Sequence, residues 1–101
     1  MAQNLQQEID STIASNKVVV YSKTWCGFCT STKQLLNSKG VQYKLIELDT
    51  IGNGDAIQAA LQSKTGQRTV PSIFINGQHI GGNSDLQAAN SNGSLDAKLA
   101  A

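Results

Sequence analysis

The segment "PSIFINGQHIGG", residues 71–82, restricts the fold more than any other stretch of the chain. Two short apolar runs flank Asn76-Gly77, a dipeptide typical of the type I′ turn that joins antiparallel strands. The segment therefore predicts a β-hairpin. Any fold for this chain must hold an antiparallel strand pair in its last third.

The first half of the chain predicts a different strand pair. Residues 17–22, "KVVVYS", form a continuous β-branched run that is typical of a buried strand. A helix is expected over residues 29–40, ending at Gly40, and a second strand over residues 41–48, "VQYKLIEL". This strand–helix–strand unit followed by a hairpin predicts an α/β fold with a four-stranded mixed sheet and helices on both faces.

Further helices are expected on either side of these strands. Leu5, Ile9 and Ile13 recur every four residues in an amphipathic helix over residues 4–15. Asp55 is positioned to cap a helix over residues 56–66, and two short helices are expected near residues 83–90 and 94–100. A chain of 101 residues fits one compact domain, residues 1–101.

Composition argues against two kinds of partner. The net charge is +1 and the eight Lys and Arg residues are scattered, so charge indicates neither a nucleic-acid partner nor a membrane surface. No apolar run approaches the length of a membrane span. The opening "MAQNLQQEID" resembles neither a secretory signal nor a transit peptide, so a cytoplasmic location is expected.

Both cysteines of the chain lie in "TWCGFCTS", residues 24–31, with two residues between them. In a reducing compartment, catalysis, redox sensing or metal binding is a more frequent use of such a pair than a structural disulfide. A structural zinc site takes four ligands, and the chain offers these two cysteines and the distant His79. Two cysteines separated by two residues, in a segment between a predicted strand and a predicted helix, favour redox chemistry.

The predicted position of Cys26 at the start of a helix explains this chemistry. Unpaired backbone N–H groups and the helix dipole stabilise a thiolate there, and the thiolate is the nucleophile. Cys29 shares its helical face at a separation that a disulfide accepts, and Lys23 adds a nearby cation. Cys26 is therefore predicted to be the thiol that attacks a disulfide, and Cys29 the thiol that resolves the mixed disulfide. The alternative is that both are small core residues.

Four separated segments together resemble the glutaredoxins, a branch of the thioredoxin fold. They are "SKTWCGFC", "DAIQAAL", "GQRTVPSIFINGQHIGG" and "NSDL". Thioredoxins typically carry a proline at the position of Phe28 and a buried acid at the position of Val20, so both residues argue against that branch. The resemblance implies a thioredoxin-like three-layer α/β/α architecture.

The resemblance also implies a glutathione site. Thr69, Val70 and Pro71 resemble the cis-proline loop of the family, in which the Val70 backbone would pair with an extended peptide. One glutathione carboxylate would meet Lys23 and Gln58. The γ-glutamyl end would meet Ser84 and Asp85, and Phe28 would form an aromatic wall. The alternatives are that Pro71 simply starts a strand, that Lys23 and Gln58 are ordinary solvated side chains, and that Ser84 or Asp85 only caps a helix.

Other residues near these segments carry weaker expectations. Arg68 either assists with carboxylates or is simply exposed, and Trp25 is expected to form an apolar flank of the site. His79 is interpreted as a surface residue of an edge strand, and Tyr21 and Tyr43 as core or strand residues.

By resemblance, the function is that of a glutathione-dependent thiol–disulfide oxidoreductase. Cys26 alone would reduce protein–glutathione mixed disulfides, and Cys26 with Cys29 would reduce protein disulfides. The implied partners are glutathione and glutathionylated or disulfide-containing proteins, and the implied state is a monomer.

The alternative function is an iron–sulfur scaffold or carrier. Some glutaredoxins hold one [2Fe–2S] cluster between two protomers, through the first active-site cysteine of each and two glutathiones. Gly27 is typical of such members, whereas the second cysteine and the bulk of Trp25 argue against cluster binding. Cys26 would be the protein ligand. No other metal ligand is predicted.

Overall fold

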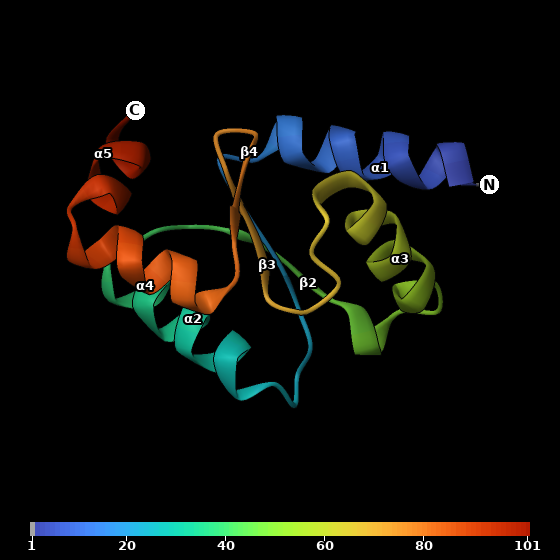
Figure 1. The fold of residues 1–101 in the computed structure, drawn as a ribbon, viewed down its shortest axis with the longest axis horizontal. Helices are drawn as coiled ribbons and strands as arrows, with labels where there is room; N and C mark the ends of the chain where they lie inside the picture. The colour runs from blue at the N-terminus through green and yellow to red at the C-terminus, as the bar shows by residue number, and fades with distance from the viewer. Residues whose placement is uncertain (1) are drawn as a thin grey trace.

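The computed structural model describes residues 2–101 and places helices on both faces of a four-stranded sheet (Figure 1). The helices are α1 (Ala2–Ser15), α2 (Gly27–Ser38), α3 (Gly54–Thr65), α4 (Asn83–Ser91), α5 (Ser94–Ala100) and the short 3₁₀ helix η1 (Leu48–Thr50). The strands are β1 (Val18–Ser22), β2 (Lys44–Glu47), β3 (Ser72–Ile75) and β4 (Gln78–Gly81).

The sheet is mixed, as the sequence predicts. Its strand order is β2-β1-β3-β4. Strands β1 and β2 are parallel and joined through α2, while β3 lies antiparallel to β1 and to β4. Ser22, the last residue of β1, is level with Glu47, the last residue of β2. The chain therefore leaves these two strands at the same end of the sheet, where the cysteine motif follows β1.

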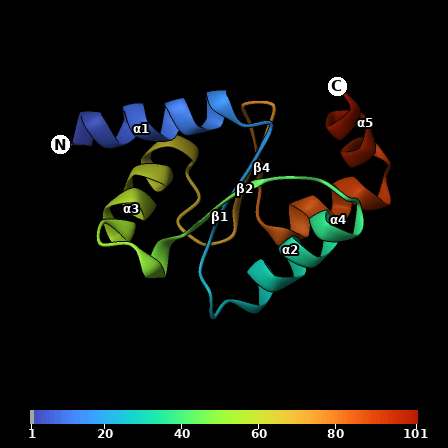
Figure 2. The same cartoon turned by 180° about the vertical axis from the view of Figure 1, so that it is seen from behind.

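Two apolar clusters cover the two faces of the sheet. Because side chains alternate along a strand, β1 supplies Val19 and Tyr21 to one cluster and Val18 and Val20 to the other. Helices α1 and α3 cover the first face, and α2, α4 and α5 cover the second (Figures 1 and 2). The buried residues are Ile9, Ile13, Val19, Tyr21, Leu48, Ile57, Leu61 and Phe74 in the first cluster, and Val18, Val20, Leu36, Ile73, Ile75, Leu86, Ala89 and Leu95 in the second.

The predicted hairpin turn is confirmed. Asn76 and Gly77 have φ angles of 53° and 78°, the positive values that a type I′ turn needs at both central positions. The Asn76 side chain donates a hydrogen bond of 2.8 Å to the carbonyl of Lys98, and its backbone N–H donates one of 2.8 Å to the carbonyl of Lys17. The turn is thus tied to both ends of the chain.

Helix α2 ends as its sequence predicts. Gly40 follows the C-cap residue Lys39 with φ 68°. The N–H groups of Gly40 and Val41 donate to the carbonyls of Asn37 and Leu36, which is the hydrogen-bond pattern of a Schellman motif. These bonds satisfy two carbonyls that the helix leaves unpaired.

Two local predictions differ from the structure. Strand β2 begins at Lys44 and not at residue 41, since residues 41–43 connect α2 to the sheet without pairing. Asp55 does not cap α3, because the helix begins two residues earlier than predicted, at Gly54, with Asn53 at the N-cap. A Cβ atom at Gly54 would lie 1.8 Å from the Leu48 carbonyl oxygen, so close packing against η1 determines this helix start.

Within residues 2–101, no helix is both long and apolar enough to cross a membrane. The 14-residue helix α1 falls short of the roughly 20 residues that a bilayer span needs.

Candidate active site around Cys26

Cys26 lies where the chain turns from β1 into α2. It is the N-cap residue of α2, with φ −95° and ψ 119°, and its Sγ accepts a hydrogen bond of 3.2 Å from the N–H of Cys29. The first turn of α2 holds no acidic residue. Cys26 is half-buried, so its sulfur is accessible from outside at the end of the helix that attracts negative charge.

Cys29 has the opposite environment. Both thiols are free, but Cys29 is completely buried beneath the first turn of α2. Burial raises the pKa of the Cys29 thiol, as does its interaction with Cys26, while a hydrogen bond with the Ser22 hydroxyl lowers it. Of these two thiols, only that of Cys26 is therefore accessible to a reagent from outside, and the division into attacking and resolving thiols stays a prediction.

The cis-proline loop lies directly beside Cys26. The Val70–Pro71 peptide bond is cis, as predicted, and the Cys26 thiol donates a weak hydrogen bond of 3.8 Å to the Val70 carbonyl. Val70 is half-buried, Pro71 is buried and Thr69 is exposed. The loop thus brings a backbone segment from the far half of the chain to the reactive sulfur.

The cis-proline loop is held by two residues that sequence reasoning did not assign to the site. The Gln67 side chain donates hydrogen bonds of 2.7 Å to the Pro71 carbonyl and 3.0 Å to the Thr69 carbonyl. Its Oε1 lies 2.9 Å from Nε2 of His79. His79 belongs to the edge strand β4 and keeps an exposed edge, as predicted, yet its ring nitrogen takes part in this network.

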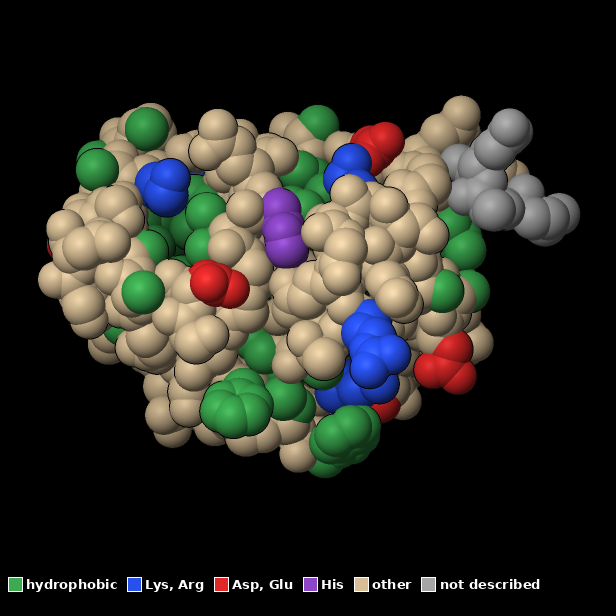
Figure 3. Space-filling model, in the orientation of Figure 1, with side chains coloured by type: hydrophobic (Ala, Val, Ile, Leu, Met, Phe, Trp, Pro, Cys, Tyr) green, Lys and Arg blue, Asp and Glu red, His purple; other side chains and the backbone are tan. Residues whose placement is uncertain are grey.

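Exposed aromatic side chains flank Cys26 on both sides. Trp25 is 73% exposed and Phe28 is 70% exposed. The Lys23 ammonium lies 5.3 Å from the centre of the Trp25 ring, within cation–π range. Figure 3 shows hydrophobic and basic side chains side by side on the lower edge of the molecule. The Trp25 ring, expected to form an apolar flank, is therefore largely exposed to solvent.

Asp49 fixes the loop that leads into Cys26. Its carboxylate accepts a hydrogen bond of 3.0 Å from the Thr24 N–H and a second one from the Thr24 hydroxyl. These bonds hold the pKa of Asp49 below its ordinary value. The contact joins residues that are 25 positions apart in the sequence, and no sequence motif indicates it.

Gln58 and Arg68 are linked to each other through the backbone. The Gln58 side chain, half-buried on α3, donates a hydrogen bond of 2.7 Å to the Arg68 carbonyl. The Arg68 side chain is exposed. One amide hydrogen of Gln58 thus orients the chain just before the cis-proline loop.

Ser84 and Asp85 lie in a groove beside that loop. The groove has a volume of about 550 Å³ and is lined in part by Thr69, Gln67 and His79. Helix α4 begins at Asn83, as predicted, so Ser84 and Asp85 belong to its first turn. Asp85 accepts a hydrogen bond of 3.1 Å from the Gly82 N–H, which makes it a helix-capping residue that also lines the groove.

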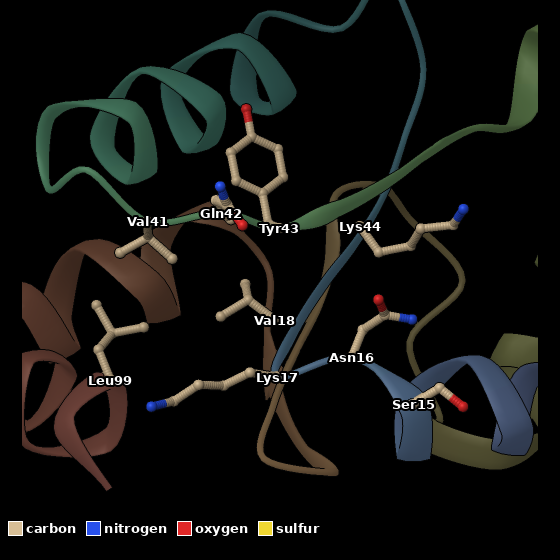
Figure 4. A pocket seen from close by; sticks show the side chains of 9 residues that line it. All are labelled: Ser15, Asn16, Lys17, Val18, Val41, Gln42, Tyr43, Lys44 and Leu99. Atoms are coloured by element: carbon tan, nitrogen blue, oxygen red, sulfur yellow. The ribbon is translucent and has the colours of Figure 1, made fainter.

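A larger cavity, about 650 Å³, lies at the opposite end of β1. Val18, Val41 and Leu99 line one part of it, and Lys17 extends along its edge (Figure 4). None of the residues predicted from the sequence to act or bind lies in this cavity. This larger cavity and the cysteine motif are therefore at different ends of the sheet.

An ion pair lies next to the buried thiol. Lys33 follows Cys29 by one helical turn, and its Nζ is 2.9 Å from a carboxylate oxygen of Glu47. The side chains are 20% and 18% exposed, and the second Glu47 oxygen is buried without a hydrogen-bond partner. The bond to Glu47 raises the pKa of Lys33.

Comparison with known proteins identifies the family. The family model for glutaredoxin matches residues 18–80, more than half of the chain. The chain belongs to the glutaredoxin family. A glutaredoxin of Ricinus communis is 54% identical over 83 residues, which cover 82% of this chain and 81% of the relative. Glutaredoxins are oxidoreductases, so the chain is assigned to this class of enzyme.

Solved glutaredoxin structures share the fold. A structure described as the buckwheat glutaredoxin–glutathione complex matches with a TM-score of 0.96 and 44% identity, over 98% of this chain and 90% of that chain. Glutaredoxin-C5, chloroplastic, of Arabidopsis thaliana is 44% identical over 97 residues, and this chain spans 56% of its length. The thioredoxin-like three-layer architecture expected from the sequence is thereby confirmed.

The glutaredoxin site contains no ready-made metal centre in the described part of the chain. No three His, Cys, Asp or Glu side chains within residues 2–101 lie close enough together to hold a metal ion. A single copy offers one accessible thiol, Cys26. A [2Fe–2S] cluster would need thiolates from outside this copy.

Proposed function

We propose that the protein is a glutathione-dependent thiol–disulfide oxidoreductase. One observation carries the proposal: the half-buried Cys26 sulfur lies at a helix N-terminus and faces the Val70 backbone of a cis-proline loop. This arrangement combines a stabilised thiolate with a backbone strip for an extended peptide. The similarity to a glutaredoxin solved with glutathione supports glutathione as that peptide.

The first reaction removes glutathione from a protein. The Cys26 thiolate attacks the glutathione sulfur of the mixed disulfide, and the protein thiolate leaves and takes a proton. A second glutathione thiolate then attacks the glutathione sulfur on Cys26, which releases glutathione disulfide and restores the Cys26 thiolate. This cycle uses only the accessible sulfur.

The second reaction reduces a protein disulfide. Cys26 attacks one sulfur of the disulfide, and Cys29 then loses its proton and attacks Cys26, which releases the reduced protein and leaves a Cys26–Cys29 disulfide. Because burial and the neighbouring Cys26 raise the pKa of Cys29, this thiol stays protonated until the mixed disulfide forms. Two glutathiones then reduce the intramolecular disulfide.

The residues around Cys26 suggest how glutathione is held. The Val70 backbone would pair with its cysteinyl residue, and the first turn of α4 at Ser84 would donate N–H bonds to the γ-glutamyl carboxylate. Asp85 would accept the γ-glutamyl ammonium. The glycine carboxylate would meet Lys23 and Gln58, and Phe28 and Thr69 would flank the peptide.

Two cysteine variants test this function. We expect Cys26→Ser to abolish deglutathionylation of a glutathionylated peptide, because no second thiol is exposed. Cys29→Ser should keep most of this activity but lose reduction of a protein disulfide. Steady-state assays of both variants on both substrates provide the measurement, and full deglutathionylation by Cys26→Ser would refute the proposal.

The [2Fe–2S] scaffold is the alternative. It requires Cys26 of two copies and two glutathiones, and the open surroundings of Gly27, where an added Cβ meets no atom within 4 Å, leave room beside the sulfur. Anaerobic reconstitution with iron, sulfide and glutathione distinguishes the two functions. A coloured dimer would support the alternative, and a colourless monomer would remove it.

We propose glutathionylated and disulfide-containing proteins as substrates and a monomer as the working state. The cytoplasmic location is likewise a proposal, and two similar relatives from Arabidopsis are described as chloroplastic. Imaging of the tagged full-length protein would distinguish these compartments.

A further inference from the structure

The orientation of the Gln67 carboxamide is fixed by its partners. Its Nε2 meets two carbonyl oxygens, those of Pro71 at 2.7 Å and Thr69 at 3.0 Å. Carbonyl oxygens only accept hydrogen bonds, so the group facing them must be the NH₂ of the amide. The Gln67 oxygen consequently points the other way, to His79.

The protonation of the His79 ring follows from that orientation. Oε1 of Gln67 lies 2.9 Å from Nε2 of His79 and can only accept, so Nε2 must carry a hydrogen. The ring lies against Phe74, with 5.0 Å between ring centres, and its Nε2 is also 3.3 Å from the Ser72 hydroxyl. Desolvation lowers the pKa of His79, although the charge of Asp85 opposes this shift, so the ring is neutral near pH 7.

These bonds connect His79 to the backbone segment that faces the Cys26 sulfur. His79 donates to Gln67, and Gln67 donates to the carbonyls of Thr69 and Pro71, on either side of Val70. The carbonyl of Val70 itself accepts a separate hydrogen bond from the Cys26 thiol. Both carbonyls that flank Val70 are therefore held by one side chain, and that side chain is oriented by one ring.

We infer that Gln67 and His79 are positioning residues for substrate, acting together as a relay that sets the backbone of the cis-proline loop against Cys26. The inference rests on the proposed function, in which the Val70 backbone pairs with the glutathione moiety. Neither side chain has to touch the reacting sulfurs. Their effect is on how well a bound peptide is aligned with Cys26 and not on how reactive the Cys26 thiolate is.

Kinetics can separate alignment from thiol reactivity. We expect Gln67→Leu and His79→Phe each to lower kcat/KM for a glutathionylated peptide by about three- to tenfold, the size that the loss of one or two hydrogen bonds allows. The rate of Cys26 alkylation by iodoacetamide should change less than about twofold, because this small reagent needs no backbone pairing and the start of α2 is unchanged. The matched control is Gln78→Leu on the exposed end of β4, which should leave both rates unchanged.

The double variant tests whether the two residues act as one unit. Gln67→Leu/His79→Phe should be no worse than Gln67→Leu alone, because His79 acts only through Gln67. Multiplicative losses, wild-type kcat/KM in both single variants, or an equal loss of alkylation rate would each overturn the relay.

Nitrogen NMR of the His79 ring tests the relay without any substrate. The neutral ring should carry its hydrogen on Nε2 in the wild type, and Gln67→Leu should weaken this preference and shift the Nε2 resonance. A wild-type ring protonated on Nδ1 would overturn the inference. Failure of the proposed function looks different: the wild type and Cys26→Ser would be equally inactive on the glutathionylated peptide while the Nε2 tautomer persists.

Discussion

The two ends of strand β1 differ in their surroundings: a large cavity borders one end, and the candidate active site follows the other. The end at Val18 borders the larger cavity, about 650 Å³, whose lining mixes apolar side chains with polar ones, among them those of Asn16, Lys17, Gln42 and Lys44. The end at Ser22 leads to Cys26 and lies near a smaller groove of about 550 Å³. Volume alone would direct attention to the wrong end of the strand.

The difference lies in what the polar groups do. At the cysteine end they are bound to backbone: Asp49 holds the Thr24 N–H, Gln67 holds two loop carbonyls, and Asp85 holds the Gly82 N–H. These bonds fix segments from four parts of the chain around one sulfur. A functional site is thus recognised by polar groups that converge and orient backbone, more than by the size of a cavity.

The largest effect within this comparison is expected for Gly81→Ala at the groove. Gly81 has φ 122°, and a Cβ there would lie 2.2 Å from Oδ2 of Asp85. The carboxylate would have to leave the Gly82 N–H, so we expect a loss of about 1–3 kcal/mol in the free energy of unfolding. KM for a glutathionylated peptide should also rise several-fold. Urea unfolding and steady-state kinetics measure the two effects.

Gly52→Ala is the matched control for that variant. A Cβ at Gly52 meets no atom within 4 Å and Gly52 is absent from the positive-φ glycines of the described chain. Its stability and KM should stay close to those of the wild type. If Gly81→Ala behaved like Gly52→Ala, the proposed role of Asp85 would be wrong.

The next effect concerns the ion pair behind Cys29. Lys33→Met removes the cation that pairs with the Glu47 carboxylate. One oxygen of this carboxylate is already buried without a hydrogen-bond partner. We expect a loss of about 1–2 kcal/mol in the free energy of unfolding, measured in urea. The double variant Lys33→Met/Glu47→Leu should recover part of this loss, because it removes the unpaired charge. A double variant less stable than either single one would contradict this account.

A smaller, pH-dependent effect is expected at Asp49. The Thr24 bonds lower its pKa in the folded state below the ordinary 3.8, so the stability that they contribute is present above pH 3.8 and is lost as the pH falls through the lowered pKa. Thermal unfolding between pH 7 and pH 2 should show a weaker acid-induced decline in Asp49→Asn than in the wild type. Thr24→Val, which keeps the backbone bond, should fall between them. An identical decline in all three would exclude this contribution.

The smallest effect is expected at the other end of β1. Gln42→Ala removes an exposed side chain from the larger cavity, and we expect its stability to stay within roughly 0.5 kcal/mol and its kcat/KM to equal that of the wild type. A clear loss of activity on a glutathionylated peptide would show that this end also contributes to function.

The sequence predicted the features that depend on local signals. The Asn76-Gly77 turn, the order of helices and strands, the mixed sheet and the helix start at Cys26 were all predicted from patterns within a few residues. The cis peptide before Pro71 and the thioredoxin-like layers came from the resemblance to the family. The binding roles of Lys23, Gln58, Ser84 and the other candidate residues stay predictions.

The features that sequence reasoning missed depend on distant contacts. Gln67 contacts His79, which lies 12 residues away in the sequence, and Asp49 contacts Thr24, which lies 25 residues away. Asp49 belongs to no periodic pattern or motif, and although Gln67 lies in the segment "GQRTVPSIFINGQHIGG", no local signal indicates its contact with His79. The cap predicted at Asp55 was wrong for the same kind of reason, because the packing of Gly54 against η1 sets the start of α3.

The exposed Trp25 has a practical consequence. It is the only tryptophan in the chain, and it adjoins Cys26 while its ring faces the Lys23 ammonium. The protein therefore carries an intrinsic fluorophore one residue from the proposed nucleophile, and we expect its emission to report the formation of a mixed disulfide on Cys26 in the unlabelled protein.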